Sequence, residues 1–490
     1  MSVGRTSLLL LPLAVVSRGV AFLIPIAMAR LYGAAAEMDA WYWALSFPVF
    51  ALVLASGAMG TAAMPAVAAA RLRGPDRLGA LLTALGLGGA CALVAGGALL
   101  AALSPGLLPR ITTFEPNIQR LTTSFLWSFL PFLGLVPVGT ALRIANEQAG
   151  RFGLVAATPL LRAAVVLGAL AAGQGRLLAP TVLPLSLAAG ELAQIAVWAW
   201  PLWRDGVRPA RPAGAAAELG LALRGLGPVL GGEGMIALGF VLDKAAAANF
   251  SPGAVSVVEY AERARAIPQT LFESSLLMVG FATWARSQAA GARDEAEDGL
   301  RAAVGWTLAL ASPVVAGLSL GRTLGVQVLY ERGAFTAQDT AQTAVILGGY
   351  LVGLVPGLLG VLAMRGLVVQ GRVARVLALG ALGAAVNLAL DGIGVQLGFG
   401  TISLALGTSA GQLVMATLGL MSLGVHRGGR GIGASLGLAA GSAVFAVSLE
   451  ALGGAITSWT DPRLGVGVLG CVALLLAGAR ISRRPRPHHA

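Results

Sequence analysis

The feature that most constrains the fold is a succession of long apolar runs, joined by short polar connections, along almost all of the 490 residues. A continuous apolar run of about 18 residues or more can cross the ~30 Å hydrocarbon core of a bilayer as a helix. The runs do not alternate at every second residue, as the strands of a membrane barrel would. Only 11% of the residues are charged, against roughly a quarter in soluble proteins. The sequence therefore predicts an all-α integral membrane protein.

We expect about fourteen transmembrane helices. The predicted spans are residues 7–32, 38–62, 78–104, 121–145, 152–174, 178–202, 221–248, 265–288, 301–328, 341–364, 373–396, 400–424, 431–453 and 463–480. The first span follows Arg5, as the core of a signal sequence would. Because its apolar stretch continues to Arg30 without a clean small-residue cleavage site, we expect it to be retained.

The basic residues predict the orientation, since Lys and Arg concentrate in cytoplasmic loops. With the N-terminus in the cytoplasm, most of the 34 basic residues fall on that side. The basic tail after Arg480 would favour an anionic cytoplasmic leaflet. The net charge of +12 therefore reports topology and not nucleic-acid binding. We predict a multi-pass protein of the bacterial cytoplasmic membrane with both termini in the cytoplasm.

The connections between spans are too short for a soluble catalytic domain, and neither a GxxxxGK[ST] nor an HExxH motif is present. Cys91 and Cys471 lie within apolar runs, which argues against a disulfide framework or a metal cluster. We therefore expect a protein that is not an enzyme.

A weak internal repeat suggests how the helices are grouped. Residues 148–151 read Gln-Ala-Gly-Arg after the fourth span, and residues 370–372 read Gln-Gly-Arg after the tenth. This spacing predicts two six-helix lobes related by a parallel pseudo-two-fold axis, as in some transporters. The predicted domains are 1–203 (N-terminal lobe), 204–425 (C-terminal lobe) and 426–490 (two further helices and a basic tail).

Several charged residues lie within apolar runs, where each needs a partner or a wet cavity. Arg18 in the first span could pair with a carboxylate, or could capture an anionic ligand in a central cavity, since guanidinium grips phosphate oxygens. Asn387 and Asp391 are four residues apart, hence on one helical face. With Asp243 and the Thr408 hydroxyl they would form a site for a hard cation. Alternatively, Asp391 caps its span at the interface.

Three glutamates also lie within apolar runs: Glu191, Glu233 and Glu273. Glu233 stands among glycines, and a protonatable carboxyl there could couple transport to protons. The structural interpretation, which we favour for all three, is an ion pair with a buried arginine such as Arg162.

One connection has a distinctive sequence, Leu-Tyr-Glu-Arg-Gly-Ala-Phe-Thr-Ala-Gln-Asp-Thr at residues 329–340. Physically, Thr336 and Asp339 form a helix-start cap. The same stretch resembles the MurJ (MviN) lipid II flippase family of the multidrug/oligosaccharidyl-lipid/polysaccharide exporter superfamily. The resemblance extends along nearly the whole chain. The segments that carry it are Ala29–Gly33 with Asp39-Ala40, Gly57-Ala58 with Pro65, Asn146 with Arg151-Phe152, Tyr260–Arg263, and Arg365 with Gly371.

The resemblance implies a flippase that moves lipid-linked peptidoglycan precursor across the membrane by alternating access. It implies substrate-binding roles for Arg18, Arg30, Asp39 and Arg263. It also implies that Asp243, Asn387, Asp391 and Thr408 are ligands of Na⁺ as a coupling ion, with no other cofactor. The implied partners are a polyprenyl-diphosphate-linked glycan such as lipid II, membrane lipid and, as candidates, cell-wall synthesis proteins.

The sequence departs from the family pattern in the first lobe. Ile24 and Pro25 stand where the family usually has Arg-Asp, and residues 46–53 of the second span contain no basic residue. Each charge-assisted hydrogen bond to the cargo that is lost in this way lowers the binding free energy by on the order of 1.5–3 kcal/mol. This departure favours a second hypothesis, an exporter of another polyprenyl-linked polysaccharide. A third is a non-transporting paralogue that acts as a scaffold in envelope assembly.

Overall fold

Glycine and proline set many of the helix ends. Pro75 and Pro116 occupy the first turns of helices α4 (Pro75–Ile111) and α5 (Pro116–Ser128), where a missing N–H costs nothing. The expected cap at residue 336 is confirmed: Thr336 and Asp339 form a reciprocal capping box at the start of α15 (Ala337–Val369). Local signals in the sequence thus determine where apolar runs become separate helices.

The computed structural model describes residues 3–173, 181–273 and 293–424, and part of 456–474. The chain divides into two compact units. Unit 1 comprises Met1–Ser256 and the short segment Arg332–Phe335, and unit 2 comprises Val257–Glu331 and Thr336–Ala490. The N-terminal and C-terminal lobes were predicted from an internal repeat, whereas the two units are defined by their compactness. The two lobes therefore stay a prediction.

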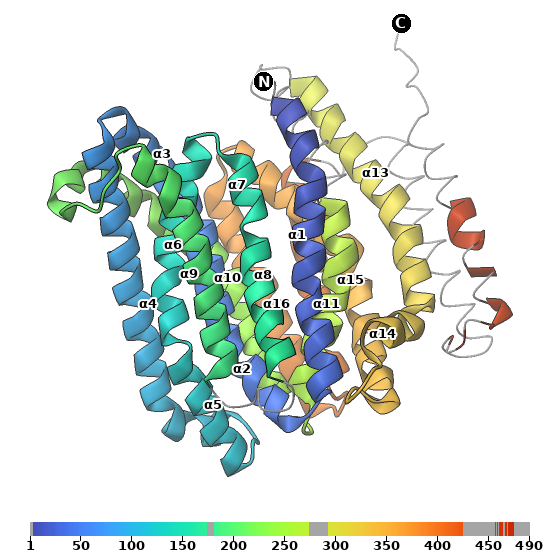
Figure 1. The fold of residues 1–490 in the computed structure, drawn as a ribbon. Coiled ribbons are helices and arrows are strands. Elements are labelled where there is room, and N and C mark those ends of the chain that lie inside the picture. The colour runs from blue at the N-terminus through green and yellow to red at the C-terminus, as the bar shows by residue number, and fades with distance from the viewer. Residues whose placement is uncertain are drawn as a thin grey trace, which may run out of the picture. The chain divides into compact units, whose positions relative to one another are not determined.

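Unit 1 is built from helices throughout its described part. Besides α4 and α5 its elements are α1 (Val3–Tyr32), α2 (Ala36–Val53), the π-helix η1 (Leu54–Met59), α3 (Gly60–Leu72), α6 (Leu130–Gln148), α7 (Phe152–Ala157), α8 (Pro159–Ala172), α9 (Val182–Arg204), the 3₁₀ turn η2 (Pro212–Ala215) and α10 (Ala216–Ala247). Helices α4, α6 and α9 run side by side (Figure 1). Because α2, η1 and α3 follow one another without a break, Ala36 and Leu72 lie at opposite ends of one long helix.

Unit 2 is also helical in its described part. Its elements are α11 (Ala254–Phe272, whose first three residues belong to unit 1), α13 (Arg293–Leu320), α14 (Arg322–Tyr330), α15, α16 (Val373–Gln396) and α17 (Ile402–Ser422). Its largest core cluster contains leucines of α13 and α15 with residues of α16 and α17, such as Leu308, Leu362, Leu379 and Ala416.

Large apolar side chains are exposed along the middle of several helices. Leu99 of α4, Val352 of α15 and Leu413 of α17 are each more than half exposed. In the part of the chain that the structure describes, nine helical segments are long and apolar enough to cross a membrane. Such helices with exposed apolar flanks match a protein surrounded by hydrocarbon, as the sequence predicted.

Eleven of the predicted spans coincide with described helices, and much or all of each of the other three lies outside the described residues. The span 431–453 lies wholly outside them, and 463–480 lies largely outside. The span 265–288 was placed too late, since α11 already begins at Ala254. Four charged residues between 259 and 265 lowered the hydropathy of its first turns. The total of about fourteen spans stays a prediction.

The two repeat segments have the same local structure. Gly150 and Gly371 both adopt positive φ, 74° and 70°, directly after α6 and α15. The following arginines also match, with φ and ψ of −86° and 46° at Arg151 and −87° and 47° at Arg372. The sequence similarity at these positions therefore corresponds to one type of helix-ending turn.

Candidate functional site

Asp39, in the first turn of α2, holds the first residues of α11. Its carboxylate accepts hydrogen bonds from Gly253 N at 2.6 Å, Ser256 N at 2.8 Å and Ser256 Oγ at 2.7 Å. The side chain is only 2% exposed. An anion at this position is favoured because the start of a helix carries unpaired N–H groups and positive partial charge. Asp39 was predicted to bind substrate, but here it bonds to protein donors.

Two loops meet beside this carboxylate with their backbones in contact. Ala334 N donates to Arg30 O at 2.9 Å. Gly33 and Gly333 have φ of 62° and 64°, and a methyl group on either would clash with a backbone carbonyl, that of Ala334 or Arg30 respectively. We call Arg30–Ala34, Gly253 and Arg332–Phe335 the loop cluster; all of it belongs to unit 1. The distinctive motif at 329–340 thus includes a segment docked onto the end of α1.

The arginines predicted to bind substrate have different environments. Arg30 is exposed at the last turn of α1. Arg263 of α11 pairs with Glu259 one turn earlier, with 2.7 Å between Nη2 and Oε1, and its side chain is 38% exposed. Arg18 lies within α1, but its side chain falls outside the described residues. The structure therefore leaves the substrate-binding roles of all three as predictions.

Two of the predicted cation ligands lie together in unit 2. Asn387 and Asp391 of α16 are both buried and face Gly407 of α17, where a methyl group would clash with both side chains. Thr408, the next residue on α17, donates its hydroxyl hydrogen to Leu404 O at 3.0 Å. Asp243 is buried in α10 and belongs to unit 1.

Of the glutamates in the apolar runs, Glu191 follows the structural interpretation. Arg162 Nη1 lies 3.1 Å from Glu191 Oε2, which confirms the predicted pair. Glu273 accepts a hydrogen bond from Gln269 at 2.8 Å. Glu233 lies on α10, and its side chain falls outside the described residues, so proton coupling through it stays a hypothesis.

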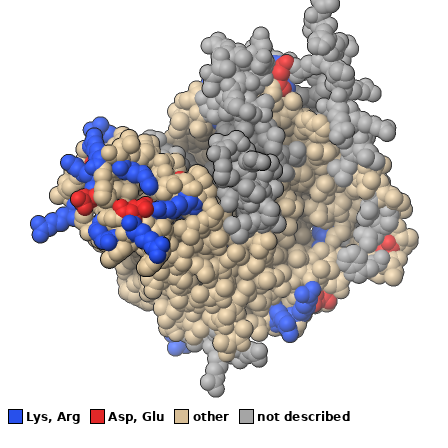
Figure 2. All heavy atoms as spheres, turned by 45° about the horizontal axis from the view of Figure 1, so that its top comes forward, with Lys and Arg blue, Asp and Glu red and all other residues tan. Residues whose placement is uncertain are grey.

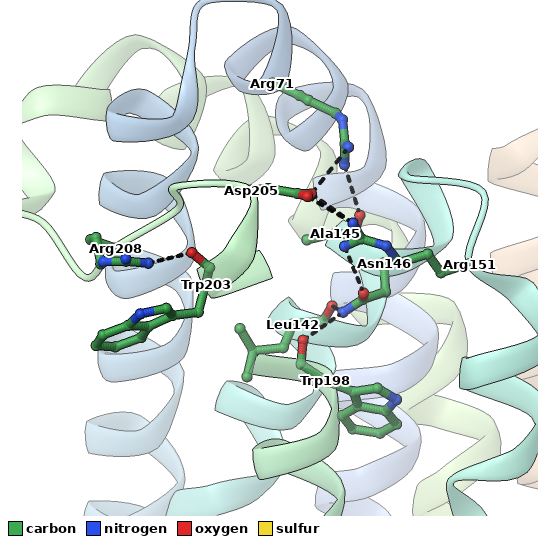
Figure 3. A network of polar contacts seen from close by, with 9 residues as sticks. All are labelled: Arg71, Leu142, Ala145, Asn146, Arg151, Trp198, Trp203, Asp205 and Arg208. Atoms are coloured by element: carbon green, nitrogen blue, oxygen red, sulfur yellow. Dashed lines mark hydrogen bonds and ion pairs between the residues drawn. The ribbon is translucent and has the colours of Figure 1, made fainter. Parts of the chain in front are cut away.

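At the other end of the long helix, Asp205 joins three elements of unit 1 (Figure 3). Arg151 Nη2 donates to both carboxylate oxygens, at 2.9 and 2.8 Å. Arg71, in the last turn of α3, lies 3.8 Å from the same carboxylate and donates to Ala145 O at 3.2 Å. The ends of α3, α6 and α9 and the start of α7 are thereby tied together.

Asn146 extends this network into the helices. Its Nδ2 donates to Leu142 O at 2.9 Å on its own helix and to Trp198 O at 3.0 Å on α9. Arg151 donates to its Oδ1 at 3.4 Å. Asn146 and Arg151, noted in the sequence for their resemblance to the family, therefore have a structural role in holding α6 against α9.

Basic side chains gather around this end of unit 1 (Figure 2). They come from the end of α3, the start of α4 and the connection between α9 and α10, and include Arg71, Arg73, Arg77, Arg208 and Arg211. Arg73 pairs with buried Glu218 at 2.6 Å. Beside this cluster, a broad surface contains residues other than Lys, Arg, Asp and Glu (Figure 2). This is the side predicted to be cytoplasmic, and the predicted orientation is not tested by these contacts.

Sequence reasoning missed Ser256, Asp205 and Arg265. Ser256 comes shortly after Gly253, and Asp205 comes directly before Gly206. A glycine at such a position signals a helix end, but it does not reveal a partner that is distant in the sequence. Arg265 lies two residues after Arg263 in a charged segment, where one more arginine carries no distinctive signal.

Comparison with known proteins gives a consistent result. A family model described as "Lipid II flippase MurJ" matches residues 28–467. The "Probable lipid II flippase MurJ" of Thermotoga maritima is 26% identical over 405 residues, 79% of this chain and 78% of that protein. A protein of the same description from Bdellovibrio bacteriovorus is 28% identical over 137 residues, 28% of this chain and 26% of that protein.

Solved structures share the fold. "Lipid II flippase MurJ, inward closed conformation" matches with a TM-score of 0.80 at 19% identity, over 97% of this chain and 98% of that one. An inward-facing multidrug resistance MATE family transporter of the MOP superfamily matches with a TM-score of 0.71 at 13% identity, over 84% and 98%. The all-helical transporter fold expected from the sequence is confirmed.

Proposed function

We propose, from the premise that the chain belongs to the lipid II flippase MurJ family, that it moves lipid-linked peptidoglycan precursor across the cytoplasmic membrane by alternating access. In such a cycle one end of the protein must close while the other is open, and the closure must be reversible. The cargo would be a polyprenyl-diphosphate-linked glycan.

The observation that carries the proposal is the engagement of Asp39 with the start of α11 next to the loop cluster. The carboxylate accepts three hydrogen bonds from two residues more than two hundred positions later in the chain. These bonds join chain segments without a covalent link, so they can form and break during a cycle. We assign them to closure of the side predicted to face away from the cytoplasm.

The arginines would hold the cargo by its diphosphate. Guanidinium binds phosphate oxygens through two parallel hydrogen bonds and stays charged at any relevant pH. Arg263 suits this role because its side chain is partly exposed and its partner Glu259 lies on the same helix. Arg18 and Arg30 on α1 would supply further positive charge.

A reconstituted translocation assay tests the proposal. Proteoliposomes with the purified chain should move a fluorescent lipid II analogue between leaflets, and Arg18→Ala and Arg263→Ala should each abolish complementation of a flippase-depleted strain. Arg375→Ala, at an exposed position of α16, is the matched control and should complement. Full growth of both test variants would refute the assigned roles.

The absence of basic residues from 46–53 and the presence of Ile24 and Pro25 favour a second candidate, export of another polyprenyl-linked polysaccharide. The same assay with a teichoic or capsular precursor separates the two, because the preferred cargo should move faster. No movement of any polyprenyl-diphosphate substrate would instead favour an envelope scaffold.

Na⁺ is our proposed coupling ion. Asn387 and Asp391 offer oxygen atoms at one buried position against a bare glycine, a donor set that suits a hard cation. Thr408, also in unit 2, would add its hydroxyl oxygen.

A further inference from the structure

Unit 2 contains a deeply buried arginine whose function is not explained by the roles given above. Arg265 of α11 is only 6% exposed. It lies two residues after Arg263, which turns its side chain by about 200° to nearly the opposite face of the helix. Arg263 and Arg265 therefore occupy separate environments.

The contacts described for Arg265 are with uncharged groups. Its guanidinium carbon lies 5.3 Å from the centroid of the Tyr350 ring on α15. In the amide orientation that satisfies both ends, Gln412 of α17 accepts from Arg265 Nη1 at 3.3 Å and donates to Gly353 O at 2.7 Å. Nε of Arg265 is buried without an acceptor. Within the described ranges, no carboxylate forms an ion pair with this guanidinium.

The same chain shows the usual solution to burying an arginine. In unit 1, Arg162 is paired with Glu191 at 3.1 Å, although the Arg162 side chain is 29% exposed. Arg265 is much more buried, and a buried charge is costly unless it is paired and hydrogen-bonded. A ring face and one long hydrogen bond compensate only part of that cost. The arrangement is that of a site whose counter-charge comes from a ligand.

The described contacts use one face and one N–H group of the guanidinium and leave Nε without an acceptor. Stacking on Tyr350 uses the face of the group, while phosphate binds to the N–H edge. Gln412 is fixed beside that edge because two glycines of α15 make room for it. A methyl group at Gly353 or Gly357 would lie 2.6 or 3.0 Å from the Gln412 amide.

We propose that Arg265, with Gln412 and Tyr350, forms an anion site in unit 2 that binds phosphate oxygens. The inference rests on the proposed function in taking the diphosphate of the lipid-linked cargo as the main source of those oxygens. Free phosphate is the other source. Such a site would restore part of the positive charge that is missing at residues 24 and 46–53.

The test is binding to the purified full-length chain in detergent, with farnesyl diphosphate, inorganic pyrophosphate and farnesol as probes. Arg265→Gln should raise the dissociation constant of farnesyl diphosphate by tenfold or more, Arg265→Lys by less, and Arg375→Gln should leave it unchanged. Binding of farnesyl diphosphate alone would identify the lipid-linked diphosphate as the ligand, whereas equal binding of pyrophosphate would identify free phosphate.

A second readout separates a ligand site from a structural arginine. Without any probe, Arg265→Gln should unfold at the same temperature as the wild type or higher, because an uncompensated buried charge has been removed. Wild-type affinity in Arg265→Gln, or equal binding of farnesol, would overturn the anion site. If only the translocation assay of the wild type fails, the proposed function is wrong and the site stands.

Discussion

At the scale of single residues, two buried carboxylates of unit 1 are stabilised in different ways. Asp39 accepts hydrogen bonds from backbone and hydroxyl groups at the start of α11. Glu191 is instead paired with an arginine from the neighbouring helix. The first arrangement depends on where a distant loop lies, and the second only on the packing of α8 against α9. Asp39 is therefore suited to a moving contact and Glu191 to a permanent one.

Asp39→Asn should destabilise the chain more than Ser256→Ala. The asparagine amide places a donor against the donors of Gly253 or Ser256 and removes the charge, which we expect to cost about 3 kcal/mol. Ser256→Ala removes one hydrogen bond and should cost about 1 kcal/mol. Thermal unfolding in detergent measures both. Equal stability of Asp39→Asn and wild type would contradict the role of the carboxylate.

The Arg162–Glu191 pair should show strong coupling in a double-mutant cycle. Arg162→Met or Glu191→Met alone leaves the other charge unpaired and should cost on the order of 3 kcal/mol. The double variant should regain most of that loss, because two apolar side chains need no counter-charge. Denaturation of the four proteins gives the coupling energy. Additive losses would show that the two side chains do not depend on each other.

The sequence predicted an arginine partner for Glu191 because a charge in an apolar run needs a partner or a wet cavity. It did not predict the partners of Asp39, since Gly253 contributes only a backbone N–H and Ser256 is a common residue. Nor did it distinguish Arg265 from Arg263. Contacts made by backbone groups, and the face of a helix that is buried, depend on tertiary packing.

At the scale of elements, the helix ends matter as much as the helices. Positive-φ glycines follow α1, α6 and α15, but their surroundings differ. Gly371 has open space around its Cα hydrogen, whereas Gly33 and Gly333 touch backbone carbonyls of another loop. The same turn residue can thus end a helix or also allow two loops to meet.

Gly33→Ala and Gly333→Ala should therefore be more harmful than Gly371→Ala. All three force alanine into the left-handed region, which costs about 1 kcal/mol. The first two also push a methyl group into a carbonyl, so the loop cluster must separate. We therefore expect Gly33→Ala and Gly333→Ala to unfold at lower temperatures than Gly371→Ala and to translocate less cargo. An equal effect of all three substitutions would mean that the loop cluster is not tightly packed.

The element prediction succeeded where long apolar runs determine the structure and failed where other forces do. Eleven predicted spans coincide with described helices, because a long apolar run specifies a helix without help from residues distant in the sequence. The start of α11 was missed because a distant carboxylate, Asp39, stabilises a polar helix end. The π-helix η1 was also not foreseen, since its six residues, Leu54–Met59, have no distinctive sequence.

At the scale of the whole molecule, the candidate cation ligands come from both units. Asn387, Asp391 and Thr408 belong to unit 2 and Asp243 to unit 1. The resemblance implies all four as ligands, and which of them bind an ion together depends on the arrangement of the units. A ligand-binding measurement on the intact chain addresses this directly.

Sodium should raise the unfolding temperature of the wild type, because a ligand that binds only the folded state stabilises that state by mass action. The free energy of unfolding should rise by about 2.7 kcal/mol at a sodium concentration of a hundred times Kd. Choline at equal ionic strength should raise neither. Asp391→Asn should abolish the shift, and Asp298→Asn, which removes an acid of α13 that pairs with Arg301, should keep it. A full sodium shift in Asp391→Asn would disprove the site.

The docking of Arg332–Phe335 has a consequence for how the gene can be divided. These four residues belong to unit 1, yet the chain on both sides of them belongs to unit 2. A fragment that ends at Ser256 would lack the peptide that donates to Arg30 O, and the complementary fragment would carry that peptide with nothing to dock on. Co-expressed halves should therefore find each other through this short insert. The C-terminal half thus carries a piece of the N-terminal unit's architecture.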